Sequence, residues 1–249
     1  MRDRARPAIA ALGFLTAVRV GRRTPISAGD LRRGVAFFPL VGALVGALMG
    51  VVAWAVAHVL PPVPAAILGV AAATAVTGAL HLDALADTAD GVGASLAGGD
   101  PAEAMSDPRL GTWGGAALVL DLLLKVSVLV AVLTTGTFPW PTVAAGALSR
   151  TSLVALAWAV PYGGPDEGTG AWTRGIDRRA CLAGLGAGAA ICLLAVGVRA
   201  VPMATVAALV CLPIAGWSRS HLDGMRGDTF GAAAECTETL ALTASLLAL

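Results

Sequence analysis

Long apolar runs separated by short polar stretches dominate this chain. A membrane-spanning helix needs about 20 mostly apolar residues, and the pattern offers about seven runs of that kind. We expect spanning helices over residues 34–60, 63–82, 114–135, 138–161, 180–201, 203–217 and 230–249. The segment before residue 33 is shorter and rich in arginine, which is typical of an interfacial helix. The pattern therefore predicts an all-α, polytopic integral membrane bundle that forms one membrane-embedded domain over residues 1–249.

The composition supports a membrane protein and excludes several other classes. Of the 249 residues, 57% are hydrophobic and only 13% are charged, against about 25% charged in an average soluble domain. So few charges cannot cover such an apolar core in water, and they form no basic face for a nucleic acid. The four cysteines lie in or beside apolar runs without C-x-x-C spacing, which argues against a zinc or redox site.

The arginines predict the orientation in the membrane. Eight of the 16 arginines lie within the first 33 residues, and loops rich in Lys and Arg stay in the cytoplasm. With seven spans, the connections at 83–113, 162–179 and 218–229 then share the cytoplasmic side with the N-terminus, and the C-terminus lies outside. We expect a multi-pass protein of the cytoplasmic (inner) membrane whose polar clusters all face the cytoplasm.

Three glycines recur at four-residue spacing in the first long run: Gly42, Gly46 and Gly50. Small residues at this spacing form a ridge that lets helix backbones approach closely. We expect this ridge to serve close helix packing, and a homodimer through the glycine-rich helices is compatible with it.

The densest polar cluster carries Asp83, Asp87 and Asp90 at positions i, i+4 and i+7. On a helix, these three positions fall within an arc of about 60°. Three carboxylates on one stripe repel each other unless a cation lies among them, and no Lys or Arg occurs between residues 33 and 109. Mg²⁺ commonly takes one or two carboxylates together with substrate phosphates. The stripe therefore favours a metal or phosphate–metal site over the alternative, a solvated acidic helix end.

Two further clusters contain groups that suit an anionic ligand. Asp107-Pro108 marks a turn, and Arg109 can hold a phosphate with two hydrogen bonds or act as a basic anchor at the membrane surface. Asp228 follows Gly227 at the start of the last run, where free backbone N–H groups can bind an anion. A plain helix N-cap is the alternative interpretation of Asp228.

Charged residues inside the apolar runs need partners because an unpaired charge in a membrane is costly. Asp121 and Lys125 are four residues apart and can neutralise each other. Arg150 needs an anionic partner from the protein or a ligand, and Glu235 and Glu238 are expected to face a cavity or a partner. His81 lies about 160° from Asp83 on an ideal helix, so it joins the acidic stripe only if the helix begins near it.

Five stretches together resemble the cobalamin synthase family, the adenosylcobinamide-GDP ribazoletransferases. They are His81–Gly91, Phe14-Leu15-Thr16 through Arg19, Phe38–Gly42, Asp107–Gly114, and Gly227–Ala232 followed by Glu235. The resemblance covers nearly the whole chain, and the first stretch is the most specific. The chain departs from the family pattern at Ala84, where Gly is usual, at Val20, where Pro is usual, and at Arg226, where Thr is usual.

The resemblance implies a membrane enzyme that joins adenosylcobinamide-GDP to α-ribazole or its 5′-phosphate, releases GMP and needs Mg²⁺. It implies these two substrates and the lipid bilayer as partners, and no nucleic acid. For the site, it suggests Asp83, Asp87 and Asp228 as metal ligands, and Asp90 and Asp87 as catalytic residues. Substrate binding is expected from Arg109, Arg150, Arg19, His81, Asp107 and Glu235. Residue spacing leaves open which aspartate is the base and which is a ligand.

Two other classes of function remain as alternatives at this stage. An ion-coupled transporter would use Asp121, Lys125, Glu235 and Glu238 as an intramembrane relay. A scaffold for other enzymes would show no turnover by itself. The position of the acidic stripe at the end of a span, and the short outer connections, favour the enzyme.

Overall fold

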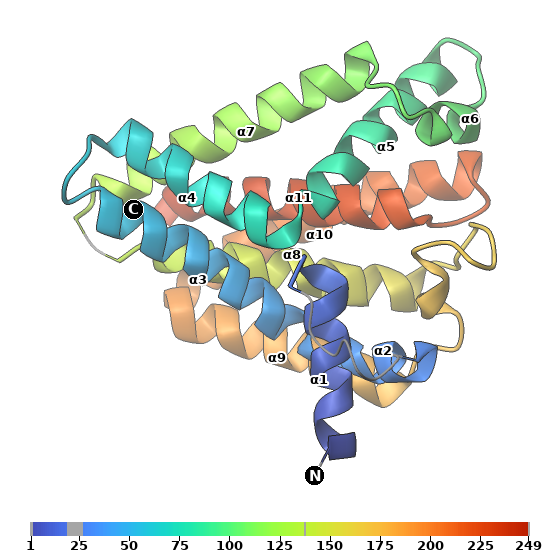
Figure 1. The fold of residues 1–249 in the computed structure, drawn as a ribbon, viewed down its shortest axis with the longest axis horizontal. Helices are drawn as coiled ribbons and strands as arrows, with labels where there is room; N and C mark the ends of the chain where they lie inside the picture. The colour runs from blue at the N-terminus through green and yellow to red at the C-terminus, as the bar shows by residue number, and fades with distance from the viewer. Residues whose placement is uncertain (1, 19–26, 137, 249) are drawn as a thin grey trace.

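The fold is a bundle of helices (Figure 1). The computed structural model describes residues 2–18, 27–136 and 138–248. Within these ranges the chain is helical apart from its connections and one isolated bridge between Tyr162 and Met225. The α-helices are α1 (Arg2–Leu15), α2 (Ala28–Gly34), α3 (Phe38–Val56), α4 (Pro62–Thr77), α5 (Leu80–Leu96), α6 (Pro101–Ser106), α7 (Thr112–Leu133), α8 (Trp140–Ala159), α9 (Arg178–Val196), α10 (Ala200–His221) and α11 (Gly227–Ala244). The predicted all-α class is confirmed.

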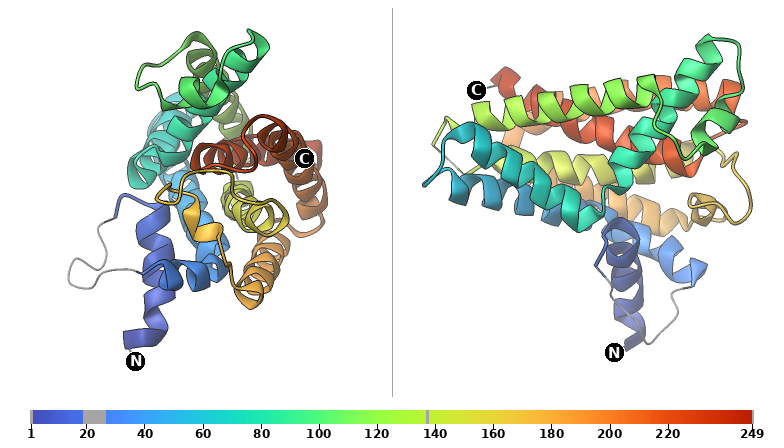
Figure 2. Two further views of the ribbon diagram at one scale, coloured as in Figure 1. Left: turned by 90° about the vertical axis from the view of Figure 1, so that its right-hand side faces the viewer. Right: turned by 45° about the horizontal axis from the view of Figure 1, so that its top comes forward.

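Helix α8 is the centre of the bundle. It contacts α3, α9, α10 and α11, and most of its side chains are buried. Its sequence fits this place, because Ala, Gly and Ser recur along it and leave room for neighbouring helices on several sides. Helices α7 and α11 run beside each other on one side of the bundle, while α1 projects from the opposite side (Figure 2).

The glycine ridge of α3 packs against α8. A Cβ atom at Gly42 or Gly46 would overlap the carbonyl groups of Gly146 and Thr142, and one at Gly50 would meet the Thr142 side chain. Close helix packing is therefore confirmed, but α8 of the same chain fills the ridge. These three glycines are not free for the homodimer contact that the sequence suggested.

The expected count of seven spans is not confirmed. Helices occupy all seven expected regions, but within the described residues four helical segments are long and apolar enough to cross a membrane: Ala28–Val56, Thr112–Leu133, Trp140–Ala159 and Arg178–His221. The bent pair α4 and α5 makes a fifth if it is counted as one span. The last segment comprises α9 and α10, which Gly197 separates with a φ of 60°. Helix α11 carries Asp228, Glu235 and Glu238 and is less apolar than the expectation assumed.

The N-terminal region is more complex than one interfacial helix. Helix α1 occurs where it is expected, and it packs on α2 and on the start of α3. The short helix α2, which begins at a capping box between Ser27 and Asp30, has no counterpart among the predicted elements. The interfacial position of α1 stays a prediction.

The polar connections gather at one end of the bundle. The segment around α6, the connection from α8 to α9 and the turn from α10 to α11 all lie on the right in Figure 1. The turn between α3 and α4 and the C-terminus lie at the opposite end. This arrangement agrees with the expectation that the connections at 83–113, 162–179 and 218–229 share one side.

Candidate active site

The acidic stripe begins directly after a sharp break between α4 and α5. Helix α4 ends at Thr77 and is capped by Gly78, which has a left-handed φ of 63°, and Ala79 follows with a φ of 58°. A positive φ is uncommon for a residue with a Cβ atom, and such strain often occurs at functional sites. The two helices meet at 89°, so α5 turns away from α4 with the aspartates along it. The sequence predicted one span over 63–82 and missed this break.

Helix α5 crosses α11 closely enough to bring two acidic clusters together. At the crossing point a Cβ atom on Gly231 would overlap the Cβ of Ala84, so only glycine at position 231 permits this approach. Asp83 and Asp228 then line one cavity of about 170 Å³, together with His81. The structure thus joins residues that lie 145 positions apart, as the resemblance implied.

Asp87, one turn after Asp83, lies in a field of negative charge. Burial, and then the neighbouring carboxylates of Asp83, Asp228 and Asp90, raise its pKa to about 6. Burial likewise raises the pKa of Asp228, and the charge of Asp83 adds to this effect. Helix α5, which carries three of these aspartates, lies outside the four spanning segments. A cation among the carboxylates of Asp83, Asp87 and Asp228 would relieve their mutual repulsion.

The donor set suits a hard metal ion that shares its ligands with a substrate. Among the described residues, no three His, Cys, Asp or Glu side chains lie close enough together to hold a metal ion by themselves. Mg²⁺ is usually held by one or two carboxylates, with water and substrate phosphates completing its shell. The oxygen donors of Asp83, Asp87 and Asp228 fit such a joint site and not a closed protein cage.

Asp90 ties α5 to the start of α7. Its carboxylate accepts backbone N–H bonds from Gly111 and Gly114, both at 2.8 Å. These two N–H groups belong to the N-terminus of α7, which favours a negative charge. Each carboxylate oxygen keeps a second lone pair, so the proton-accepting role of Asp90 stays a prediction. The contacts show that Asp90 also positions α7, a role that the sequence did not indicate.

Asp107 and Arg109 form an exposed pair near this end of the bundle. The guanidinium of Arg109 donates to both carboxylate oxygens, with Nη2–Oδ2 at 2.6 Å and Nε–Oδ1 at 2.9 Å. These hydrogen bonds lower the pKa of Asp107 to about 2. The side chain of Arg109 is 86% exposed, so it remains accessible to a phosphate. Arg19, which was also expected to bind substrate, lies outside the described residues.

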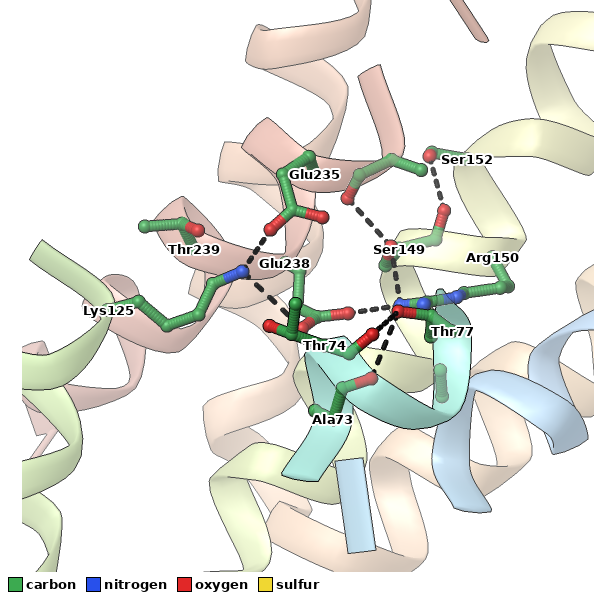
Figure 3. Close-up of polar contacts among 12 residues, drawn as sticks. Ala73, Thr74, Thr77, Lys125, Ser149, Arg150, Ser152, Glu235, Glu238 and Thr239 are labelled. Atoms are coloured by element: carbon green, nitrogen blue, oxygen red, sulfur yellow. Dashed lines mark hydrogen bonds and ion pairs between the residues drawn. The ribbon is translucent and has the colours of Figure 1, made fainter. Parts of the chain in front are cut away.

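A second charged cluster lies inside the bundle. Lys125 of α7 forms ion pairs with Glu235 and Glu238 of α11, and Arg150 of α8 pairs with Glu238 (Figure 3). Lys125 also pairs with Asp121, one turn earlier on α7. Lys125–Asp121 measures 3.5 Å and Lys125–Glu238 measures 3.6 Å. All five residues are at most 9% exposed. The expected neutralisation of Asp121 by Lys125 is therefore confirmed as part of a larger network.

This network accounts for two residues that were expected to bind substrate. The structure does not bring Arg150 or Glu235 to the cavity beside Asp83. Instead, they line an interior space of only about 20 Å³, which is room for about one water molecule. Because a buried charge needs a partner, each of them pairs within the protein. His81, by contrast, does line the acidic cavity. Helix α5 begins at Leu80, directly before it, which meets the condition under which His81 was expected to join the aspartates.

Sequence reasoning missed several residues of the cavity. Phe14, Trp172 and Phe230 line it, and Arg226 lies close enough to Asp228 to lower that residue's pKa. Phe14 and Phe230 lie inside the quoted motifs, so motif membership was a usable signal for them. Trp172 lies in a connection without any pattern, and only the fold brings it to the site.

Comparisons with known proteins find one family and relatives that match nearly the whole chain. The family model for cobalamin-5-phosphate synthase matches residues 7–246. A protein named adenosylcobinamide-GDP ribazoletransferase from Syntrophobacter fumaroxidans is 34% identical over 238 residues, covering 94% of this chain and 96% of the relative. A protein of the same name from Klebsiella pneumoniae (strain 342) is 37% identical over 246 residues, covering 95% and 98%. No solved structure matches this chain.

The apolar helices indicate a multi-pass membrane protein, and the proteins that it resembles over nearly their full length are named as a transferase, so its class is that of a multi-pass membrane enzyme. Both the family model and the full-length relatives point to one assignment within that class. The chain belongs to the cobalamin-5-phosphate synthase family. It is therefore a transferase of cobalamin biosynthesis.

Proposed function

We propose that this chain joins adenosylcobinamide-GDP to α-ribazole, or to ribazole 5′-phosphate, and releases GMP in a Mg²⁺-dependent reaction. The observation that carries the proposal is the meeting of Asp83 and Asp228 at one cavity, with Asp87 in their electrostatic field. The donor substrate contains a diphosphate. Carboxylates alone would repel this group, so a cation must lie between them.

In this reaction a ribose hydroxyl of ribazole attacks the phosphorus next to cobinamide. A new P–O bond forms, the bond to the bridging oxygen breaks, and GMP leaves with that oxygen. The hydroxyl proton passes to a carboxylate, for which Asp90 and Asp87 are the candidates. Asp83, Asp87 and Asp228 would hold Mg²⁺, which when bound neutralises phosphate charge as it develops. Arg109, whose side chain is 86% exposed, binds a phosphate oxygen, and Arg226, whose charge acts on Asp228, supports the binding of that phosphate.

We further infer that the cavity faces the cytoplasm from the inner membrane. Arg109, Arg174, Arg178 and Arg226 belong to connections or helix ends at the cavity end of the bundle, whereas Arg199 lies in the turn between α9 and α10. The bias follows the rule that places basic connections inside. Nucleotide-activated substrates are cytoplasmic in origin, which fits the same side.

The test is GMP release by the purified protein in lipid nanodiscs with adenosylcobinamide-GDP, ribazole and Mg²⁺. We expect turnover with Mg²⁺, partial turnover with Mn²⁺, and none in excess EDTA until the divalent ion is restored. Full turnover in EDTA would remove the metal from the mechanism. No GMP release under any condition would remove the transferase assignment for the protein alone.

The transporter alternative is not favoured. Its relay residues are the ones that the structure pairs in the interior network, where each carboxylate has a cationic partner. The transporter function would be supported by uptake of a labelled ion or corrinoid into vesicles in the absence of GMP release.

A further inference from the structure

The cavity beside Asp83 has walls of two chemical kinds. One set is acidic or polar and includes Asp83, Asp228 and His81. The other set is apolar and includes Phe14, Leu80, Leu153, Trp172 and Phe230. Only the acidic set has a role in the transfer of a phosphoryl group. The function of the apolar set, and of its three aromatic side chains in particular, is a separate question.

The aromatic side chains form a compact group drawn from distant parts of the chain. The ring centroid of Trp172 lies 5.9 Å from that of Phe14 on α1 and 6.2 Å from that of Phe230 on α11. Trp172 and Phe230 are 6% and 3% exposed, and Phe14 is half-buried. Packing among the rings holds Trp172 in place, which keeps this wall of the cavity preformed.

The size of the cavity limits what it can hold. At about 170 Å³ it is smaller than the roughly 300–1,000 Å³ of sites that take a drug-sized ligand. It therefore suits one flat ring system with its remaining groups outside. A corrin macrocycle is far too large for it.

The lining also discriminates between the ring systems that the two substrates carry. The guanine of the nucleotide has an exocyclic carbonyl, an amino group, a ring N–H and further ring nitrogen acceptors, and buried polar groups without partners are costly. The benzimidazole ring of ribazole has no exocyclic polar group and one free ring nitrogen. His81, 5% exposed, lines the cavity, and its Nδ1 has no hydrogen-bond partner among the described residues. The ring with a single polar atom is the better match for this wall.

We propose that Phe14, Trp172 and Phe230 form the subsite for the base of the ribazole acceptor and so determine acceptor specificity. This inference rests on the proposed function and adds the residues that recognise the second substrate. Held there, the acceptor's ribose would extend toward Asp83 and Asp228, which line the same cavity. The aromatic residues act on binding of the acceptor and not on the chemical step.

The experiment measures KM and kcat for each substrate separately in the purified full-length protein. Trp172→Leu should raise KM for ribazole about tenfold or more, which is the range for loss of stacking on a base. KM for adenosylcobinamide-GDP should stay within about threefold. Trp172→Phe should keep most of the ribazole affinity, because a phenyl ring still stacks. The matched control is Trp54→Leu, because Trp54 packs on His58 at the far end of α3.

A second measurement does not depend on turnover. Equilibrium dialysis of radiolabelled ribazole against the protein, without donor, should show binding that Phe14→Leu and Trp172→Leu both weaken. Phe14→Leu changes a half-buried residue, so it keeps the test open if Trp172→Leu fails to fold. An increase in the KM of the nucleotide donor alone would assign the cavity to guanine. An unchanged KM and unchanged binding of ribazole in both variants would overturn the proposal.

The two hypotheses fail in different ways. If the wild-type protein releases no GMP, the proposed function fails, whatever the variants do. If it releases GMP normally and the Leu variants retain wild-type affinity for ribazole, only the aromatic subsite fails.

Discussion

The guanidinium of Arg150 donates a hydrogen bond to the carboxylate of Glu238 inside the bundle, where the two side chains are 2% and 5% exposed. Arg150 also donates to Ser149 Oγ at 3.1 Å, and Ser149 donates to the carbonyl of Ala234 at 2.6 Å. These contacts join α8 to α11, and Lys125 joins α7 to the same helix. The network thus supports the helix that carries Asp228 without itself lining the acidic cavity.

Removing one partner of this buried pair should destabilise the protein. Arg150→Met leaves Glu238 without its closest cation, and breaking a buried ion pair in this way costs about 3–5 kcal/mol. The double variant with Glu238→Leu should recover much of that loss, because it leaves no unpaired charge at either position. Thermal unfolding in detergent measures both effects. If Arg150→Met unfolds like the wild type but raises the KM of the donor about tenfold, Arg150 binds substrate after all.

Asp87→Asn should reduce turnover by at least about 10²-fold while expression and membrane insertion persist. Asn keeps the volume of Asp but has no charge for a cation and negligible basicity. Removing one of the mutually repelling carboxylates should not destabilise the fold. Asp100→Asn is the control, because Asp100 is exposed and caps only the short helix α6. Turnover of Asp87→Asn within about threefold of wild type would end the role assigned to Asp87.

Asp90→Asn should also lose at least about 10²-fold in turnover, but with a lower unfolding temperature. The amide offers only one oxygen, whereas the carboxylate accepts bonds from both Gly111 and Gly114. Extra Mg²⁺ should partly rescue Asp87→Asn if Asp87 is a ligand, and it should not rescue Asp90→Asn. A destabilised Asp90→Asn variant with wild-type turnover would make Asp90 purely a positioning residue.

Gly46→Ala should prevent correct packing of α3 on α8. The added Cβ would overlap the carbonyl of Thr142, which belongs to the backbone of a central helix and cannot move aside cheaply. We expect a loss of several kcal/mol, in the range of overpacked cores, seen as a lower unfolding temperature or loss of folded protein. Gly216→Ala is the matched control, since nothing lies within 4 Å of its added Cβ. Equal stability of the two variants would contradict the close contact.

Cysteine labelling should place the cavity end of the bundle in the cytoplasm. In a background without the four native cysteines, a single cysteine at Val59 should react with an impermeant reagent added outside intact cells. A cysteine at Asp100 should react only after the membrane is opened. Both positions are exposed in the structure, so accessibility within the fold does not limit either reaction. The reverse labelling pattern would invert the orientation.

Local patterns in the sequence were sufficient for much of this description. Apolar run length predicted a helical membrane protein, because a spanning helix must satisfy its own backbone and face lipid with apolar side chains. Spacing placed Asp83, Asp87 and Asp90 on one face of a helix, and the glycine ridge indicated a close helix contact. These features depend on residues a few positions apart, where helical geometry alone relates them.

Other features required the tertiary structure, because they depend on contacts between distant segments. The pairing of Arg150 with Glu238 is one such case, since a lone buried arginine in the sequence suits a substrate phosphate as well as a glutamate 88 residues away. The break at Ala79, the approach of Ala84 to Gly231, and the arrival of Trp172 at the acidic cavity are others. The sequence determined which groups need a partner, because burial of charge makes that need unavoidable. Only the packing of helices decided which partner each of them has, since that choice rests on how closely two backbones can approach.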